Sequence, residues 1–248
     1  MQIRILLVIL TSAAFYSCSE EPLDAQKIVE KSIDAYGGDR LYTSDIEFDF
    51  RDIHYRSYTN GGDMSYERLI QSDSLGEIHD VLNNEGFKRT INSEVVELDE
   101  IWTAKYTRSV NSVVYFFRIP FNLNDEAVNK RLLSESTIDD QLYYRIHISF
   151  SENKGGEDFD DSFVYWINQE SFIIDYFAYS YSTDGGGKRF RKMINQREVN
   201  GLQVVDYINY EPKDLSKPIE EYGSYYKADG MKELSHIINR NVVVTYLE

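Results

Sequence analysis

Four carboxylates gather near the middle of the chain, directly after a pair of glycines. They are Glu157, Asp158, Asp160 and Asp161, and they follow Gly155-Gly156. Several oxygen donors on a glycine-rich loop suit Ca²⁺, a hard cation that takes about six to eight oxygen ligands. The fixed donor positions and the closing bidentate Glu of an EF-hand loop are missing. We therefore interpret the segment as a solvated hairpin turn and keep a calcium site as the alternative; no other cofactor is predicted.

A short run of cations follows a second glycine-rich segment. Lys188, Arg189 and Arg191 come directly after residues 185–187, which are all glycine. On a strand, Arg189 and Arg191 share one face and Phe190 takes the other. The segment lacks the GK[ST] sequence that opens a helix after a phosphate loop. We expect these cations to pair with the acidic loop. If they line a cleft instead, an anionic headgroup or a carboxylate is the ligand that suits them.

Aromatic residues crowd two neighbouring segments of the chain. From them we select Tyr165, Trp166, Tyr176 and Tyr179 as ligand-binding candidates, together with the two arginines. Aromatic side chains fall on both faces of the expected strands. A pocket lined by such rings suits acyl chains or sugar rings. The plainer interpretation is a core with favourable cross-strand aromatic pairs.

Signatures of the common hydrolytic sites are missing from the sequence. The histidines lie far apart without HxH or HExxH spacing, and no serine lies in a GxSxG motif. Catalytic residues are therefore not identified, and a binding protein is favoured over an enzyme. One alternative is an envelope hydrolase with Asp158, Asp175 or Asp184, which requires two of these carboxylates in one cleft. Another is a structural or glycan-contacting surface protein, which predicts exposed aromatic rings and no cavity.

The first residues predict export and lipid attachment. Residues 1–17 combine Arg4, an apolar run over 5–10 and small residues, as a cleaved signal peptide does. Cys18 follows at once and is the one cysteine of the chain. It resembles the lipidated cysteine of bacterial lipoproteins, although the bulky residues at 15 and 16 depart from the usual lipobox. We predict a signal peptide over 1–17, then a lipidated Cys18 and an acidic tether over 18–23, with the membrane as the partner.

The net charge excludes one class of partner, and the length limits the number of domains. The chain of 248 residues carries 26 Lys and Arg against 42 Asp and Glu, a net charge of −16. Nucleic-acid binding requires a cationic surface, so it is excluded. Ser19-Glu20-Glu21 resembles an acidic export tag of outer-membrane lipoproteins, which predicts the cell envelope and surface exposure; a plain solvated tether is the alternative. Residues 24–248 suffice for a single β-rich domain, and the oligomeric state stays open.

Hydrophobic periodicity predicts a β-rich fold with few helices. Helical spacing marks residues 24–36, 102–117 and 219–228, and Asn124 with two following acids predicts a short helix through Leu133. Period-two alternation predicts strands at 46–50, 64–70, 78–82, 87–91, 95–98, 142–150, 163–167, 172–181, 190–199, 202–210 and 242–246. Asn200-Gly201 is a strong hairpin signal. Consecutive antiparallel strands with inserted helices predict a strongly curved sheet, whose concave face holds helices or a ligand.

Several stretches of the chain resemble a known family. They are residues 109–116 with Pro120 and 123–125, residues 155–159 with 165–168, residues 175–176 with 184–191, and residues 35–38 with 206–210. Together they make the mature chain similar to a family of uncharacterised Gram-negative lipoproteins, which are themselves similar to Lol-type carriers. The resemblance implies a mainly β (α+β), Lol-carrier-like fold, a half-open β-barrel with helices in its mouth that holds acyl chains. It implies no activity. The leading prediction is a lipoprotein that binds a lipid or another hydrophobic ligand in the concave face of its sheet.

Overall fold

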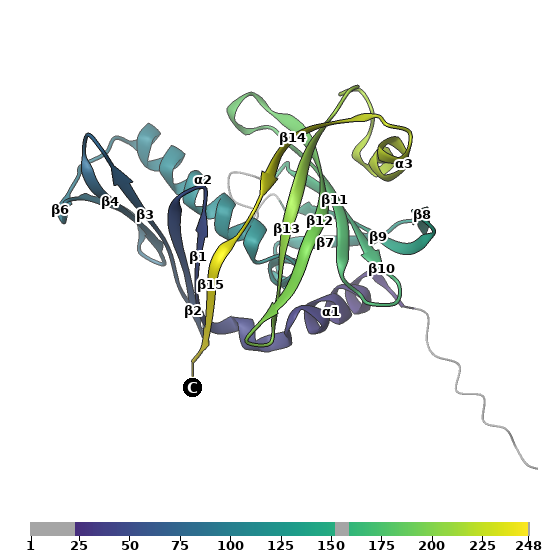
Figure 1. Ribbon diagram of the computed structural model, residues 1–248, viewed down its shortest axis with the longest axis horizontal. Coiled ribbons are helices and arrows are strands. Elements are labelled where there is room, and N and C mark those ends of the chain that lie inside the picture. Colours follow the sequence, from purple (N-terminus) through teal and green to yellow (C-terminus); the bar gives the residue numbers. More distant parts are fainter. Residues whose placement is uncertain (1–22, 152–158, 248) are drawn as a thin grey trace, which may run out of the picture.

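Two antiparallel sheets contain most of the chain (Figure 1). The computed structural model describes residues 23–151 and 159–247. The first sheet has the order β15-β1-β2-β3-β4-β5-β6, and the second has the order β14-β13-β12-β11-β10-β9-β7 with β8 beside β9. The strands of the first sheet are β1 (Thr43–Phe50), β2 (Ile53–Asn60), β3 (Asp63–Ser72), β4 (Gly76–Asn83), β5 (Gly86–Ile91), β6 (Glu94–Val95) and β15 (Arg240–Tyr246). Those of the second are β7 (Val128–Leu132), β8 (Ser136–Ile138), β9 (Gln141–Phe150), β10 (Ser162–Asn168), β11 (Ile174–Tyr181), β12 (Gly187–Val199), β13 (Leu202–Pro212) and β14 (Met231–Ile237).

The last two strands join the sheets. β14 lies at the edge of the second sheet and β15 at the edge of the first, with two residues between them. One of these residues, Asn239, is buried; its backbone N–H donates to Asp206 Oδ1 at 2.8 Å and its amide donates to the Val205 carbonyl at 2.9 Å. In the described part of the chain β6 and β7 remain unpaired outer edges, so the sheet is not closed into a barrel. The predicted half-open, curved arrangement is confirmed.

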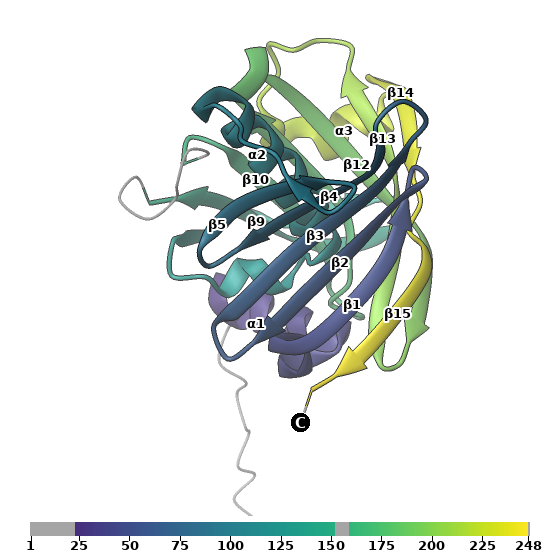
Figure 2. The same ribbon diagram turned by 90° about the vertical axis from the view of Figure 1, so that its left-hand side faces the viewer.

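Helices in the described residues lie on different sides of these sheets. They are α1 (Ala25–Tyr36), α2 (Glu100–Phe117) and α3 (Tyr222–Lys227). α1 crosses the second sheet from β13 to β7. Figure 2 shows α2 on the inner side, between the two sheets, and α3 beyond the second sheet. Among the described residues no helix is both long and apolar enough to cross a bilayer.

The main core lies on the inner side of the second sheet, beneath α1 and α2. It includes Ile28 and Ile33 of α1, Phe48 of β1, and Ile146 and Tyr165 of the second sheet, all at most 3% exposed. Each fully buried side chain of this size contributes about 1.5–3 kcal/mol to folding. A second, smaller cluster lies on the outer side of the same sheet, under α3. Both faces of the second sheet are therefore covered.

Local signals placed the two longer helices correctly. Asp24 caps α1 by accepting the Lys27 N–H at 2.8 Å, and Asp99 caps α2 by accepting the Trp102 N–H at 2.8 Å. The Asn200-Gly201 hairpin is also confirmed, with φ of 48° and 80° and with Val199 paired to Leu202. Both turn residues thus adopt the positive φ of a type I′ turn.

The helix predicted from Asn124 to Leu133 is wrong. A 3₁₀ turn over Phe121–Asn124 ends there, Asp125 is extended (φ −61°, ψ 145°), and Val128–Leu132 form β7. β7 pairs with β9 along its whole length. An available sheet edge therefore outweighs the weak helical signal of Asn124 and the two acids that follow it. The strand predicted at 95–98 is also reduced to the two-residue β6.

Candidate functional site

One row of side chains crosses the first sheet strand by strand, and α2 lies along it. The register aligns Phe48, Tyr55, Arg68, Asp80 and Arg89 on β1 to β5. Phe117 of α2 stacks on Phe48 with ring centroids 4.1 Å apart. Ser109 Oγ accepts from Arg68 at 2.7 Å, and the Arg89 guanidinium lies 3.4 Å from the Tyr106 ring centroid. One face of α2 is thus fixed to the first sheet at three points.

Charge within this row is balanced by a single buried carboxylate. Asp80 is fully buried, accepts from Arg68 Nη2 at 2.5 Å and accepts from Arg89 Nε at 2.6 Å. The two guanidinium groups are also almost completely buried. Such a cluster holds its geometry tightly because each charged group depends on the others for compensation.

The C-terminal end of α2 is also fixed to the first sheet. Arg118 caps this end and is 3% exposed. Its Nη1 donates to Ser57 Oγ at 3.1 Å, and its Nη2 donates to the Leu41 carbonyl at 3.4 Å. Burial lowers the pKa of the Arg118 guanidinium. A cation at this position also complements the negative end of the helix dipole.

The other face of α2 meets the second sheet through aromatic rings. The Phe116 ring centroid lies 5.9 Å from that of Phe177 and 5.1 Å from that of Tyr179, both on β11. Phe163 of β10 lies 6.4 Å from Phe116. Two cavities adjoin these contacts, and Phe116 lines both of them.

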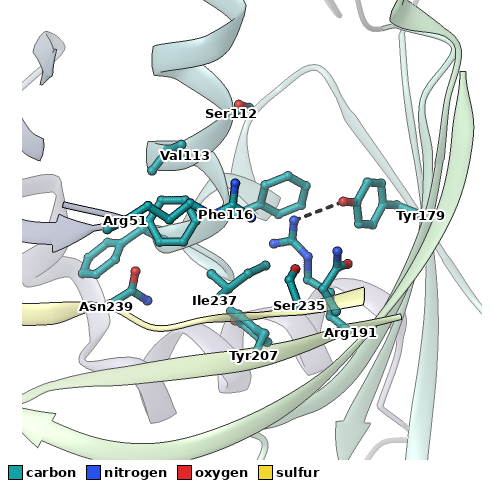
Figure 3. A pocket seen from close by; sticks show the side chains of 13 residues that line it. Arg51, Ser112, Val113, Phe116, Tyr179, Arg191, Tyr207, Ser235, Ile237 and Asn239 are labelled. Carbon is teal, nitrogen blue, oxygen red and sulfur yellow. Dashed lines mark hydrogen bonds between the residues drawn. The ribbon is translucent and has the colours of Figure 1, made fainter. Parts of the chain in front are cut away.

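The first cavity has a volume of about 290 Å³ and lies between α2, the turn after β1 and strands β12 to β14 (Figure 3). Apolar side chains that line it are Phe50, Val113, Phe117 and Ile237. The second cavity, of about 430 Å³, lies beyond Phe116 and is lined mainly by polar residues such as Lys105 and Asn111. Phe116 and Tyr179 line both cavities and so form the partition between them.

Arg191 of β12 lies in the wall of the first cavity. Only 7% of the residue is exposed. Its guanidinium carbon lies 3.8 Å from the Phe116 ring centroid, and its Nη2 donates to Tyr179 Oη at 3.0 Å. In Figure 3 the guanidinium points into the space between these two rings. Stacking on rings stabilises a cation, but it does not neutralise the charge.

Residues that line the same cavity also contain buried polar atoms without partners. Arg191 Nε, Tyr207 Oη and Asn209 Oδ1 are buried, and none has a hydrogen-bond partner in the described part of the chain. Burial raises the pKa of Tyr207, while the Arg191 charge opposes that rise. The hydroxyl is therefore protonated at neutral pH. The cavity thus combines an apolar wall with a cation and a hydroxyl donor.

A model of a family of unknown function, DUF6503, matches residues 4–239 of the chain. The chain belongs to this family. No curated protein sequence matches it. A LolA superfamily protein from Nitrosomonas europaea has a similar structure, with a TM-score of 0.51 and 13% identity over 92% of this chain and 96% of that one. A DUF1329 family protein from Desulfovibrio piger gives a TM-score of 0.45 and 10% identity over 89% and 92% of the two chains. The first likeness shows a shared fold and confirms the predicted Lol-carrier-like architecture.

In this DUF6503 protein the selected aromatic residues divide between the two faces of the second sheet. Tyr165 and Tyr179 belong to the main core on the inner side. Trp166 and Tyr176 belong to the outer cluster under α3. The pairing of Tyr165 with Phe177 and of Trp166 with Tyr176 keeps these two sets apart. The six candidates therefore do not form one pocket: Tyr179 and Arg191 line the first cavity, and the others lie elsewhere.

The cations after the glycine run have separate surroundings. Arg189 Nη1 lies 3.5 Å from Glu211 Oε1, and the Lys188 ammonium donates to the carbonyls of Leu215 and Lys217 at 2.8 Å each. Arg191 shares its face of β12 with Arg189, whereas Phe190 belongs to the outer cluster, as alternation predicts. The partners that the structure gives to these cations thus come from β11, β13 and the segment after it.

The acidic loop lies partly outside the described residues. Glu157 and Asp158 belong to the segment that is not described, while Asp160 is exposed and Asp161 partly buried. Within the described part of the chain no group of three or more His, Cys, Asp or Glu side chains is placed to hold a metal. The calcium site stays a prediction. Lipid attachment at Cys18 and the signal peptide also lie outside the described residues and stay predictions.

Asp175 is the described member of the carboxylates proposed for a hydrolase. It accepts from Tyr143 Oη at 2.9 Å and from the Asn168 amide at 3.4 Å. Burial raises the pKa of Asp175, and these hydrogen bonds oppose the rise. Asp158 and the Asp184 side chain lie outside what the structure describes, so a carboxylate pair stays a prediction.

Several residues of the cavity were missed by the sequence reasoning. They are Phe50, Arg51, Val113, Phe116, Tyr207 and Asn209. Strand pairing gives one usable signal, because Arg191 pairs directly with Asn209. Side chains of paired residues share a face, so the hairpin register places Asn209 and Tyr207 beside Arg191. No comparable pattern in the sequence indicates that Val113 and Phe116 of α2 line the same cavity.

Proposed function

We propose that this protein is a lipoprotein of the cell envelope that binds a hydrophobic ligand in the first cavity, between α2 and the curved sheet. The observation that carries the proposal is the cavity of about 290 Å³ with its apolar wall of Phe50, Val113, Phe117 and Ile237. Small-molecule sites usually measure about 300–1,000 Å³, so the space suits one slender ligand. The fold shared with a LolA superfamily protein agrees with this function, but one fold serves many functions.

Attachment at Cys18 determines where the ligand is handled. Cys18 precedes the helix cap Asp24 by a short segment, and even a fully extended chain of that length spans only about 20 Å. The domain would then stay beside the outer membrane. Cys18→Ala is expected to release the protein into the soluble fraction, while Ser19→Ala leaves it on the membrane. A Cys18→Ala protein that still sediments with membranes would contradict the anchor.

Ligand retention tests the binding function. The full-length protein is purified from its own host and its bound molecules are identified by native mass spectrometry and extraction. Val113 faces the cavity from α2 (Figure 3). Val113→Trp fills the space with an indole and is expected to abolish the bound mass. Val113→Ala enlarges the cavity at the same position, keeps a good helix former and is expected to retain the ligand.

Two results would contradict this function. The first is a wild-type protein that carries no ligand and gains none when incubated with single-chain amphiphiles. The second is a folded Val113→Trp variant, checked by its melting temperature, that retains the same ligand at the same occupancy.

A further inference from the structure

Arg191 differs from the other buried arginines of the described residues. Arg68 and Arg89 share the carboxylate of Asp80. Arg118 caps α2 and donates to three oxygen atoms. Within residues 23–151 and 159–247, Arg118 and Arg191 both lack a carboxylate partner and both have an unpaired Nε, but Tyr179 Oη is the one hydrogen-bond acceptor of the Arg191 guanidinium. A buried charge without compensation is costly, so its position in a cavity wall requires an explanation.

The groups around Arg191 match the oxygens of an anion. Arg191 Nε is unpaired, and a guanidinium presents its donors as a planar fork that fits a carboxylate or a phosphate. Tyr207 Oη is a second unpaired group that can donate a hydrogen bond. The Asn209 amide can supply a third donor after a half-turn, because its oxygen and nitrogen are interchangeable in placement. All three residues line the first cavity.

The other lining residues indicate what is attached to the anion. Val113, Phe117 and Ile237 form an apolar wall in the same cavity. In Figure 3 the Arg191 guanidinium lies beside Tyr179, and Val113 and Ile237 lie on its side away from Tyr179. Both charged groups of the lining are cations, and no carboxylate belongs to it. A polar, cationic end next to an apolar wall is complementary to an amphiphile and not to a purely apolar guest.

We infer that the ligand is a single-chain anionic amphiphile, with a carboxylate or phosphate head bound to Arg191 and a chain that runs along Val113 and Ile237. This inference rests on the proposed function and adds the ligand's chemical class. A carboxylate and a phosphate monoester share the oxygen arrangement that the guanidinium fork recognises. The volume of about 290 Å³ suits a chain of medium length or the head-proximal part of a longer one.

Probes with one chain and different heads test the assignment. The anchored full-length protein is placed in nanodiscs and titrated calorimetrically with decanoate, decyl phosphate, decanol and decyltrimethylammonium, with empty nanodiscs as the blank. At least one anionic probe is expected to bind about tenfold to hundredfold more tightly than decanol, the range that charge-assisted hydrogen bonds provide. Acetate and inorganic phosphate, which lack the chain, are expected to bind far more weakly than decanoate and decyl phosphate.

Variants then assign the preference to Arg191. Arg191→Leu is expected to lose the preference for anionic heads while decanol binding remains. Arg191→Lys keeps the charge but not the fork, so an intermediate preference is expected. Arg56→Gln, on the outer face of the first sheet where Arg56 pairs with Asp45, is the control and keeps the full preference. If Arg191→Leu does not fold, the role of Arg191 is tested by Arg191→Lys together with the affinities of the wild type for the four probes.

Each contrary result has a distinct meaning. Equal affinity of the wild type for all four decyl probes overturns the anionic head and leaves the proposed hydrophobic binding intact. An anion preference that persists in folded Arg191→Leu overturns the role of Arg191. If inorganic phosphate binds as tightly as decyl phosphate, the ligand is a small free anion and the inference of an amphiphile is wrong. Failure of every chain-bearing probe to bind contradicts the proposed function itself.

Discussion

Asp80 neutralises two buried arginines beneath α2, and its replacement tests what holds the helix on the first sheet. In Asp80→Asn the side chain keeps its shape but loses its charge. The Arg68 and Arg89 side chains are 8% and 9% exposed and that of Asp80 is 0% exposed. Two guanidinium groups would remain buried without a counter-charge. Loss of one partner from a buried ion pair costs about 3–5 kcal/mol, a large share of the roughly 5–15 kcal/mol that stabilises a typical domain.

A matched pair in the same sheet provides the control. Arg56 Nη2 lies 2.6 Å from Asp45 Oδ2, but these side chains are 39% and 20% exposed. Asp45→Asn is therefore expected to cost less than about 1 kcal/mol. With a urea dependence of about 1–3 kcal/mol per molar, the unfolding midpoint falls by roughly 1–5 M for Asp80→Asn and by less than about 1 M for Asp45→Asn. Tryptophan fluorescence and near-UV circular dichroism report both transitions.

A triple variant separates the cost of an orphaned charge from the value of the cluster. Arg68→Met, Asp80→Leu and Arg89→Met together remove every charge and keep the volume. Such replacements are often neutral or stabilising, although this one forfeits about 0.5–2 kcal/mol of cation–π contact with Tyr106. The triple variant is therefore expected to be more stable than Asp80→Asn. Equal losses for Asp80→Asn and Asp45→Asn, or a triple variant below Asp80→Asn, would refute this reasoning.

Two further substitutions test the fold. Gly37 has φ 134°, and a Cβ there would lie 2.9 Å from the Gly201 carbonyl oxygen, whereas Gly86 has φ 119° and open space around a Cβ. Gly37→Ala is therefore expected to lower the free energy of unfolding more than Gly86→Ala does, by about 1 kcal/mol or more beyond the backbone strain that both variants share. Equal urea midpoints for the two variants would exclude the clash. Burial and then Arg131 lower the pKa of His147, so its contribution to stability is complete above about pH 6.5 and is lost as the pH falls toward that lowered pKa. Urea midpoints at about pH 7.5 and pH 5.5 are expected to converge in His147→Gln relative to the wild type, and an unchanged difference would contradict the shift.

Strands whose inward residues are polar could not be predicted from alternation. β2 presents Ser57 inward, and this hydroxyl accepts from Arg118, the residue that caps α2. β14 carries Lys232 and Glu233 at the edge of the second sheet and pairs there with β13. Neither strand shows an apolar period of two, so neither was identified. By contrast, α1 and α2 have aspartate caps and apolar stripes, which are signals contained within the segment itself.

The part of the site that could be predicted is the part that depends on the alternation of side chains along one strand. Alternation placed Arg189 and Arg191 on one face of β12 and Phe190 on the other, as the structure does. Alternation does not say which face is concave, because α3 covers one face of the second sheet, α2 covers the other, and aromatic rings line both. The contact that decides the matter is Phe116 against Arg191, which joins distant parts of the chain.

That contact also determines the electrostatic environment of the Arg191 guanidinium. Phe116 and Tyr179 shield the guanidinium from solvent, which strengthens any ion pair that forms inside the cavity. The same shielding makes an arginine without a partner costly, so a bound anion would stabilise the protein as well as be held by it. An anionic amphiphile that fills the cavity should therefore raise the melting temperature of the wild type more than that of Arg191→Leu, because stabilisation follows affinity. Equal shifts in the two proteins would mean that the chain, and not the head, supplies the binding energy.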